Sequence, residues 1–323
     1  MSKLTKTAIA SAILATAFAA QADIVTSVKP LGFIASSIAD GVLDTQIIVP
    51  AGASPHDYNL KPTDVQKIKS ADLVLWIGKD VDSFLTKTIA QADQKKLITI
   101  AEIDGVTALL EKSEHHHHHD DGDDDDDHDH DHDDHDHDHE HEGHHHEVDE
   151  NGLTVNWHVW YSPQISQLVA NQLAQKLTEQ FPAKKDLIAE NLANFNRTLQ
   201  EKNTQITQQL STFKDKGFYV FHDAYGYFNN TYGLKQTGAF TINPLVAPGV
   251  KTIAKIKEEI EEHKVNCLFA EPQFTPKVID TLAKSTGVKV GRLDPMGDSI
   301  KLGKNAYSQF LQFTADSYTS CLK

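Results

Sequence analysis

No apolar run in this chain of 323 residues is long enough to cross a membrane as a helix, which takes about 20 residues. The uncharged, mostly apolar stretch from Thr7 to Ala22 follows two lysines and ends in Ala-Gln-Ala, the small-residue pattern of a signal-peptide cleavage site. We therefore expect residues 1–22 to be a signal peptide and the mature chain to be exported without a transmembrane segment. Its length suits two domains with separate cores.

Cysteine is almost absent, since the chain holds only Cys267 and Cys321, both in its C-terminal third. In an exported protein the oxidising environment favours a disulfide over two unpaired buried thiols. Closing a loop of this length would stabilise the fold by about 4 kcal/mol if the bond is unstrained. We expect the two cysteines to be bonded, which would tie the last helix to the C-terminal lobe.

Positive charge is not concentrated anywhere, and no basic stripe exists to neutralise phosphates, so we expect no nucleic-acid partner. The formal net charge of −16 comes almost entirely from residues 115–146, which hold fifteen His and fifteen Asp or Glu. Without those fifteen acids, 31 of the 46 acidic side chains remain against 30 Lys and Arg. The rest of the protein is therefore close to neutral.

The acidic, His-rich tract has no apolar side chain that could join a core, so we expect residues 113–150 to be a disordered insertion. Its imidazoles and carboxylates could hold several zinc ions weakly, because ordering a flexible loop costs entropy; the alternative is a solvated charge run. The histidines of this auxiliary metal loop are His115, His116, His117, His118, His119, His128, His130, His132, His135, His137, His139, His141, His144, His145 and His146.

Two short matches in the tract look enzymatic. His141-Glu-Gly-His-His fits the zinc-protease pattern H-E-x-x-H, and His137-Asp-His-Glu-His fits its inverted form. Both patterns need a helix that brings two histidines onto one face, and a segment of Asp, His and Gly does not supply one. No Gly-rich phosphate loop or nucleophile elbow occurs elsewhere, so we expect no enzyme.

Strand and helix patterns alternate on both sides of the tract. The sequence predicts strands of parallel sheets at 23–28, 46–49, 72–77, 96–101, 218–221, 266–270 and 288–293, of which 72–77 is a continuous apolar run. Helical spacing and start signals predict helices at 31–39, 61–70, 163–180, 183–213, 252–263 and 276–286. The helix from 183 contains no Gly or Pro and would be roughly 45 Å long.

These elements predict an α/β fold of two similar lobes, each a mostly parallel sheet flanked by helices, joined by a long bracing helix. We place the N-terminal lobe at 23–182, the linking helix at 183–214 and the C-terminal lobe at 215–323. In open parallel sheets a ligand lies at the carboxyl ends of the strands. The cleft between the lobes is therefore the expected site.

Only four histidines lie outside the tract: His56, His158, His222 and His263. The first three are in loops or at predicted strand ends, where sites are built. His263 ends a Lys/Glu-rich helix, where a cationic side chain suits the helix dipole, and we interpret it as structural. One such loop histidine is as often a surface residue as a ligand, but three in an exported chain favour a zinc site, with water or a carboxylate in a fourth position.

Six segments of the chain carry a family resemblance. They are Lys29-Pro-Leu-Gly-Phe-Ile-Ala, Gly52-Ala-Ser-Pro-His-Asp-Tyr-Asn-Leu-Lys-Pro-Thr-Asp, Ala71-Asp-Leu-Val-Leu-Trp-Ile-Gly, His158-Val-Trp-Tyr-Ser-Pro, Phe221-His-Asp-Ala-Tyr-Gly-Tyr-Phe and Leu293-Asp-Pro. In this order they resemble the zinc and manganese solute-binding proteins of bacterial ABC importers, above all the periplasmic zinc-binding members. The likeness spans nearly all of the mature chain, and an acidic His-rich loop falls where zinc members carry one.

The resemblance implies zinc ligation by His56, His158 and His222. Many zinc members have Glu immediately before the first histidine, whereas this chain has Pro55, so water is the first candidate for the fourth ligand and Asp294 the second. Manganese members resemble this layout but have Glu where this chain has His222. Imidazole suits zinc and carboxylate oxygen suits manganese, so the histidine favours zinc.

We therefore expect a monomeric periplasmic protein that captures Zn²⁺ in the interlobe cleft and delivers it to the membrane permease of an ABC importer. Three alternatives stay open. The first is a manganese-binding importer component, and the second is a periplasmic zinc buffer or adhesin that meets no transporter. The third is a zinc metalloenzyme with a bound hydroxide in the open position, which would need a general base beside the metal and a substrate-sized cavity.

Overall fold

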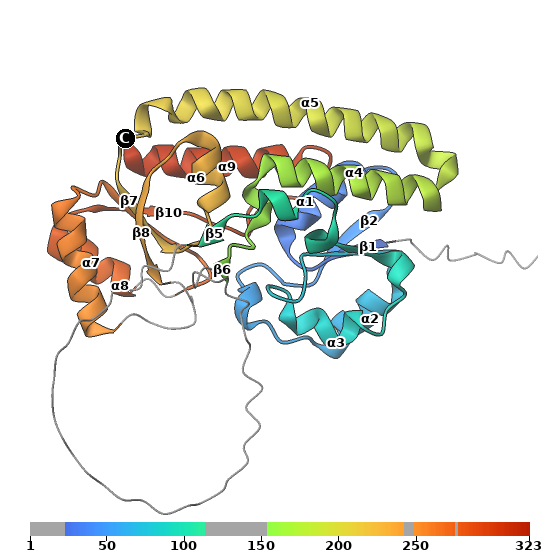
Figure 1. Ribbon diagram of the computed structural model, residues 1–323, viewed down its shortest axis with the longest axis horizontal. Helices are drawn as coiled ribbons and strands as arrows, with labels where there is room; N and C mark the ends of the chain where they lie inside the picture. Colours follow the sequence, from blue (N-terminus) through green and yellow to red (C-terminus); the bar gives the residue numbers. More distant parts are fainter. Residues whose placement is uncertain (1–22, 114–153, 242–248, 275–276) are drawn as a thin grey trace, which may run out of the picture.

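The computed structural model describes residues 23–113, 154–241, 249–274 and 277–323. The predicted signal peptide and residues 114–150 of the predicted insertion lie outside these ranges. Within them, two four-stranded sheets form two lobes that lie side by side (Figure 1). Every strand pairing in both sheets is parallel, so the predicted fold class is confirmed.

The N-terminal lobe has the strand order β2-β1-β3-β4. Its strands are β1 (Asp23–Thr26), β2 (Asp44–Ile47), β3 (Leu73–Trp76) and β4 (Leu97–Thr99). Its helices are α1 (Lys29–Ile38), α2 (Pro62–Ser70), α3 (Thr86–Ile89) and α4 (Pro163–Gln180). The central strand β3 is buried along its whole length, which is why its sequence is a continuous apolar run and not an alternating one.

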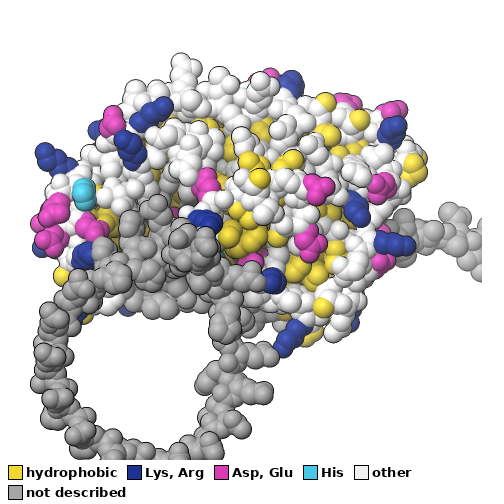
Figure 2. Space-filling model, viewed as in Figure 1, with side chains coloured by type: hydrophobic (Ala, Val, Ile, Leu, Met, Phe, Trp, Pro, Cys, Tyr) yellow, Lys and Arg dark blue, Asp and Glu magenta, His cyan; other side chains and the backbone are white. Residues whose placement is uncertain are grey.

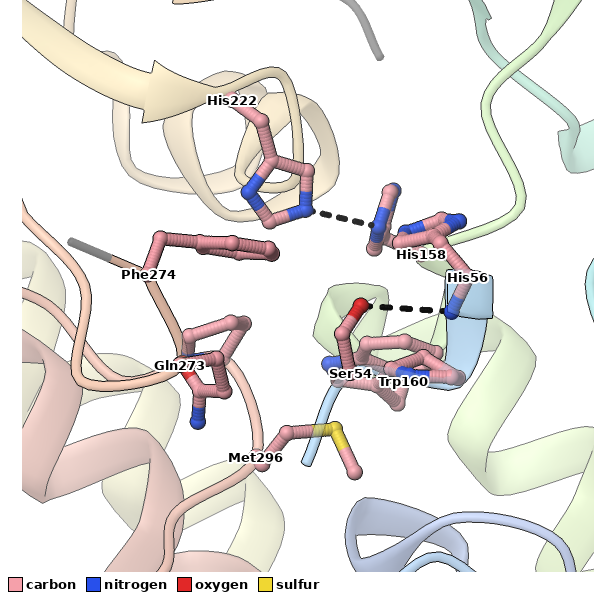
Figure 3. A pocket seen from close by; sticks show the side chains of 10 residues that line it. Ser54, His56, His158, Trp160, His222, Gln273, Phe274 and Met296 are labelled. Carbon is pink, nitrogen blue, oxygen red and sulfur yellow. Dashed lines mark hydrogen bonds between the residues drawn. The ribbon is translucent and has the colours of Figure 1, made fainter. Parts of the chain in front are cut away.

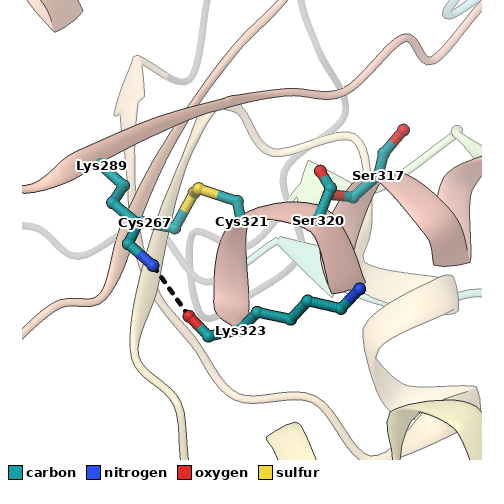
Figure 4. Close-up of a disulfide and its surroundings, with 6 residues drawn as sticks. All are labelled: Cys267, Lys289, Ser317, Ser320, Cys321 and Lys323. Carbon is teal, nitrogen blue, oxygen red and sulfur yellow. Dashed lines mark hydrogen bonds between the residues drawn. A yellow bond between two sulfur atoms is a disulfide. The ribbon is translucent and has the colours of Figure 1, made fainter.

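The C-terminal lobe has the strand order β10-β9-β7-β8. Its strands are β7 (Phe218–His222), β8 (Gln236–Thr241), β9 (Cys267–Ala270) and β10 (Lys289–Arg292). Its helices are α6 (Gly226–Tyr232), α7 (Val250–Glu262), α8 (Lys277–Thr286) and α9 (Ala306–Leu322). A disulfide joins Cys267 at the start of β9 to Cys321 near the end of α9, as predicted (Figure 4).

The long helix α5 (Lys185–Leu210) runs across both lobes (Figure 1). It is extended by 3-10 turns at Pro182–Lys184 and Ser211–Phe213, so the predicted helix over 183–213 is confirmed. Helix α9 packs against both α5 and α1. The last helix of the chain therefore returns from the C-terminal sheet to the N-terminal lobe, and α4, α5 and α9 form a helical layer over both.

One hydrophobic core continues from lobe to lobe. Phe310 of α9 lies 5.3 Å from Phe33 of α1 and 5.1 Å from Tyr161, measured between ring centroids. All three side chains are fully buried. Because the apolar contact between the lobes is extensive, the loops at the carboxyl ends of the strands are held on a single packed scaffold.

Several elements differ from the sequence-based expectation. Strand β4 ends at Thr99, and a 3-10 turn takes over the residues predicted as its second half. Strand β8 and helix α6 had no apolar run or long helical period to mark them. In β8, Gly238 is needed because a Cβ there would lie 2.6 Å from the ring of Tyr219 on β7, so the strand pairs closely without an apolar pattern.

A short antiparallel ribbon, β5 (Lys112–Ser113) with β6 (Thr154–Val155), joins the two sides of the His-rich insertion. Among the described helices, none has the length and apolar character to span a bilayer. On the face drawn in Figure 2, acidic and basic side chains are interspersed. That mixture agrees with the near-neutral charge calculated for the chain without its tract.

Candidate metal centre

Three of the histidines predicted as ligands meet at one place between the lobes (Figure 3). His56, His158 and His222 each offer a ring nitrogen, and these nitrogens all lie within 4.8 Å of one another. Among the described residues, no Asp, Glu or Cys belongs to the same group. The sequence separates these residues by up to 166 positions, so only the packing of the lobes brings them together.

His222 is the last residue of β7 and is 3% exposed. Its Nδ1 lies 2.9 Å from Oε1 and 2.8 Å from Oε2 of Glu271, which follows the neighbouring strand β9. When Nδ1 donates a hydrogen bond to this carboxylate, the neutral ring carries its lone pair on Nε2, which faces the other histidines. Glu271 therefore selects the tautomer that a metal can use.

His158 is oriented in the same way by an amide. Its Nδ1 donates to Oδ1 of Asn156 at 2.8 Å, and its backbone N–H donates to the same oxygen at 3.0 Å. Asn156 is in turn fixed, because its side-chain nitrogen donates to the carbonyl of Asp223 and its own carbonyl accepts from Tyr227. The free nitrogen of His158 is again Nε2.

His56 lies in a 3-10 turn (Pro55–Asp57) that follows β2, and it is the least buried of the three. The backbone N–H of His56 donates to Oγ of Ser54 at 3.2 Å, so Ser54 caps this turn. Pro55 occupies the first turn position, where its fixed φ suits the turn. The His56 ring centroid is 5.5 Å from that of His158 and 5.6 Å from that of His222.

The spacing fits one small metal ion. Nε2 of His158 and Nε2 of His222 are 3.2 Å apart. Two nitrogens bound to one tetrahedral zinc at 2.0–2.1 Å would be about 3.3 Å apart. The pair is therefore already at the separation that shared coordination needs.

Burial keeps the site ready to bind. Removal from water, followed by the nearby rings of His222 and His56, holds the pKa of His158 well below 6.5. A neutral imidazole is the form that ligates a metal. At neutral pH His158 therefore presents a lone pair without first releasing a proton.

The pocket around the histidines is small. Its other lining residues are Ser54, Pro55, Trp160, Gln273, Phe274, Pro295 and Met296, and its cavity volume is about 10 Å³. That is about the space that one water molecule requires. A space of this size can hold an ion and a small ligand such as water.

The other sequence-predicted candidates lie elsewhere or are otherwise engaged. Asp294 accepts hydrogen bonds from Nε2 of Gln273 at 2.9 Å and from the backbone N–H groups of Met296 and Asp298 at 3.1 and 2.7 Å. It does not belong to the three-histidine group. His263 is the C-cap residue of α7, which fits the structural role expected for it. The tract histidines lie outside the described residues.

Sequence reasoning did not single out Glu271 or Asn156. The signal for Glu271 was its place directly after a predicted buried strand, because the carboxyl ends of neighbouring parallel strands meet at one sheet edge. Asn156 is two residues before His158, a distance at which an Asn side chain commonly turns back on the chain. The Glu271 pattern identifies no partner until the strand order is known, whereas Asn156 could have been found as a local partner of His158.

Two parallel α/β lobes with a small pocket between them are the architecture of two-lobed solute-binding proteins. A family model described as "ZnuA: Zinc-uptake complex component A periplasmic" matches residues 24–321. The chain belongs to this family.

Relatives with this name match over nearly their whole length. The "High-affinity zinc uptake system protein ZnuA" of Haemophilus influenzae is 66% identical, with 100% of this chain and 99% of that protein covered. The protein of the same name from Yersinia pestis is 44% identical, with 94% and 92% covered. The matched regions include both lobes.

Solved structures with the same fold include a crystal structure of ZnuA, which is 22% identical with a TM-score of 0.73 and covers 94% of this chain and 100% of that one. The laminin-binding protein of Streptococcus agalactiae, described as having adhesin and metal-transporting activity, is 22% identical with a TM-score of 0.70 and the same coverage. At these identities the likeness supports the fold alone.

Proposed function

We propose that this protein captures Zn²⁺ with His56, His158 and His222 and delivers it for import. One observation carries the proposal: two buried imidazoles from different lobes have their Nε2 atoms 3.2 Å apart, while each Nδ1 is bound to an oxygen acceptor. A third histidine lies within 4.8 Å of both. Three preset nitrogen donors are the ligand set of an open zinc site.

Zinc is favoured over manganese by the donor atoms. The group contains three imidazoles and, among the described residues, no carboxylate. Manganese prefers oxygen ligands, whereas imidazole suits zinc. The carboxylate of Glu271 contacts Nδ1 of His222. In this proposal it orients a ligand and is not itself a ligand.

For the fourth position, water is favoured over Asp294. The carboxylate of Asp294 already accepts three hydrogen bonds, two of them from backbone N–H groups, and these would be lost if it turned toward the histidines. A water molecule matches the size of the pocket beside the histidines.

A binding role is favoured over a metalloenzyme. Hydrolysis would need a substrate-sized space and a base free to accept a proton from metal-bound water. The pocket is far smaller than the several hundred Å³ of a typical substrate site. The buried carboxylate beside the site holds a histidine ring and is not available as that base.

The place of the protein in the cell follows from its family and its N-terminus. The family description and the names of the relatives point to zinc uptake in the periplasm. Residues 1–22 serve as the export signal in this proposal, and the mature protein acts as a monomer that meets an ABC importer permease. The units are the lobe 23–182, the helix 183–214 and the lobe 215–323, with residues 113–150 as an auxiliary zinc store.

Zinc titration of single alanine variants tests the site. His56→Ala, His158→Ala and His222→Ala should each lower zinc affinity by more than about a hundredfold, since residues that only orient ligands already cost 10- to 100-fold. His263→Ala is the matched control and should bind zinc normally. Equal losses in all four variants would refute the ligand assignment.

Import is tested separately from binding. A deletion strain should grow poorly under zinc limitation, and the intact gene should restore growth while the His222→Ala gene does not. A deletion strain that takes up zinc normally would point to a buffer or adhesin.

A further inference from the structure

A carboxylate outside the metal pocket reaches the loop that carries His56. Oδ2 of Asp298 accepts a hydrogen bond from the backbone N–H of Gly52 at 2.7 Å. Asp298 lies in the connection between β10 and α9, and Gly52 lies four residues before His56. This contact joins two segments that are 246 residues apart in the sequence.

The Asp298 side of this contact is firmly held. Nζ of Lys29 on α1 donates to the Asp298 carbonyl at 2.6 Å, and the Asp298 N–H donates to Oδ2 of Asp294 at 2.7 Å. The preceding Gly297 has a φ of +61°, and a Cβ there would lie 2.8 Å from Phe310 and 2.9 Å from Phe33. This turn is therefore packed directly onto the core between the lobes.

On the His56 side the contact lies in an exposed part of the loop. Residues 50–52 are exposed, and the N–H of Ala53 donates to the carbonyl of Pro50 at 3.2 Å. His158 and His222 are 9% and 3% exposed, whereas His56 is the least buried of the three. His56 is therefore the candidate ligand nearest to the surface, and the position of its loop helps to place it.

We propose that Asp298 is a positioning residue for metal capture, which fixes Gly52 and thereby presets His56 toward the other two histidines. The inference rests on the proposed function, because it takes His56 to be a ligand. A preset ligand loses little conformational entropy when it binds the ion. Loss of the hydrogen bond between Gly52 and Asp298 lets the loop move, so that His56 can detach from the ion more easily. We therefore expect the main effect on the dissociation rate of zinc.

The first test is the dissociation rate of zinc, measured with a chelator in excess. Asp298→Ala should raise the rate constant about tenfold, which corresponds to about 1.4 kcal/mol. Asp298→Asn keeps an oxygen acceptor without the charge, so its dissociation rate constant should stay close to that of the unaltered protein. Asp280→Ala, on the exposed face of α8, removes an acid from the same lobe and should have no effect.

The second test separates positioning from a general effect of negative charge. In a His56→Ala background, Asp298→Ala should cause no further increase in the rate, because there is no His56 to position. In a His222→Ala background the tenfold increase should remain. Equal increases in both backgrounds, or an Asp298→Asn variant as weak as Asp298→Ala, would overturn the proposal.

A measurement on the unaltered protein does not depend on how the variants fold. The Gly52 amide should be protected from hydrogen exchange although Gly52 is exposed. Exchange as fast as in an unstructured chain would refute a lasting hydrogen bond between Gly52 and Asp298.

The outcomes also separate this proposal from the proposed function. If single His→Ala variants left zinc affinity unchanged, the proposed function itself would fail. If those variants lost affinity as expected but Asp298→Ala had no effect, only the positioning role would be refuted.

Discussion

Glu271 and His222 form a buried pair at the adjoining ends of β9 and β7, with Nδ1 of the histidine 2.8 Å from Oε2 of the carboxylate. Glu271 is 3% exposed and His222 also 3%. A charge this deeply buried is costly unless it is paired. The pair directs Nε2 of His222 toward His158, the arrangement that the proposed zinc site requires.

Replacing Glu271 with Gln should therefore lower zinc affinity by about 10- to 100-fold, because an amide can turn either its oxygen or its nitrogen toward His222 and no longer selects one tautomer. Isothermal titration would measure the change. Glu262→Gln, at the exposed end of α7, is the control. Unchanged affinity in Glu271→Gln would mean that packing alone orients His222.

His158 should make the zinc-free protein less stable in acid. Burial holds its folded-state pKa below the unfolded value of 6.5, so the unfolded state binds more protons. The stability present above pH 6.5 is then lost as the pH falls through the lower folded-state pKa. Urea unfolding at several pH values should show a smaller acid loss in His158→Gln. An NMR titration of His158 with a midpoint at or above 6.5 would contradict this.

The disulfide should stabilise the fold without shaping the metal site. Cys267 and Cys321 enclose a loop with a sequence separation of 54, for which chain entropy gives about 4 kcal/mol. Cys267 begins β9, whereas Glu271 follows the other end of that strand. The double Ser variant should unfold at lower urea concentration but bind zinc with nearly normal affinity. A large loss of affinity would show that α9 controls the cleft.

Asp82 should give the protein a second pH dependence. This carboxyl is fully buried after β3 and accepts from the Ile77 N–H at 2.7 Å, yet burial raises its pKa to about 7. Its folded-state pKa exceeds the unfolded value of 3.8, so its stabilising effect is complete below pH 3.8 and is lost as the pH rises to about 7. The full effect is about 4 kcal/mol at most.

Asp82→Asn keeps the acceptor for Ile77 and removes the ionisation. The free energy of unfolding of the variant, relative to that of the unaltered protein, should increase between pH 4 and pH 7. Contributions from His158 are common to both proteins and cancel in the difference. Parallel curves over this range would show that Asp82 ionises normally.

Deleting the tract, residues 115–146, should leave one tight zinc per protein and remove additional weaker ions. A preformed pocket loses little entropy on binding, whereas a segment that the sequence predicts to be disordered must be ordered by each ion. Lower pH should empty the tract first, because its imidazoles must be neutral to bind and the neighbouring carboxylates favour their protonated form. Calorimetry that finds the tightest site missing after deletion would make the tract the primary receptor.

Much of the fold could be predicted from local pattern. The apolar run at β3 reflects a fully buried strand, and the apolar residues at helical spacing in the Gly- and Pro-free stretch at α5 reflect a helix that buries one face. Strand β8 could not be predicted, because its place in the sheet depends on Gly238 fitting against Tyr219 and not on an apolar pattern of its own. The end of β4 likewise depends on the 3-10 turn at Ile100–Glu102, which has no turn signal in its sequence.

For the site, the sequence by itself determined which histidines stand in loops or at strand ends and that their chemistry suits zinc. Asn156 is a local partner, two residues before His158. Tertiary structure alone decided that Nε2 of His158 meets Nε2 of His222, that Glu271 holds Nδ1 of His222, and that Asp298 reaches Gly52. Residue type fixes what a side chain can coordinate. Its distance from a partner on another strand depends on strand order and lobe packing, which no local stretch of sequence contains.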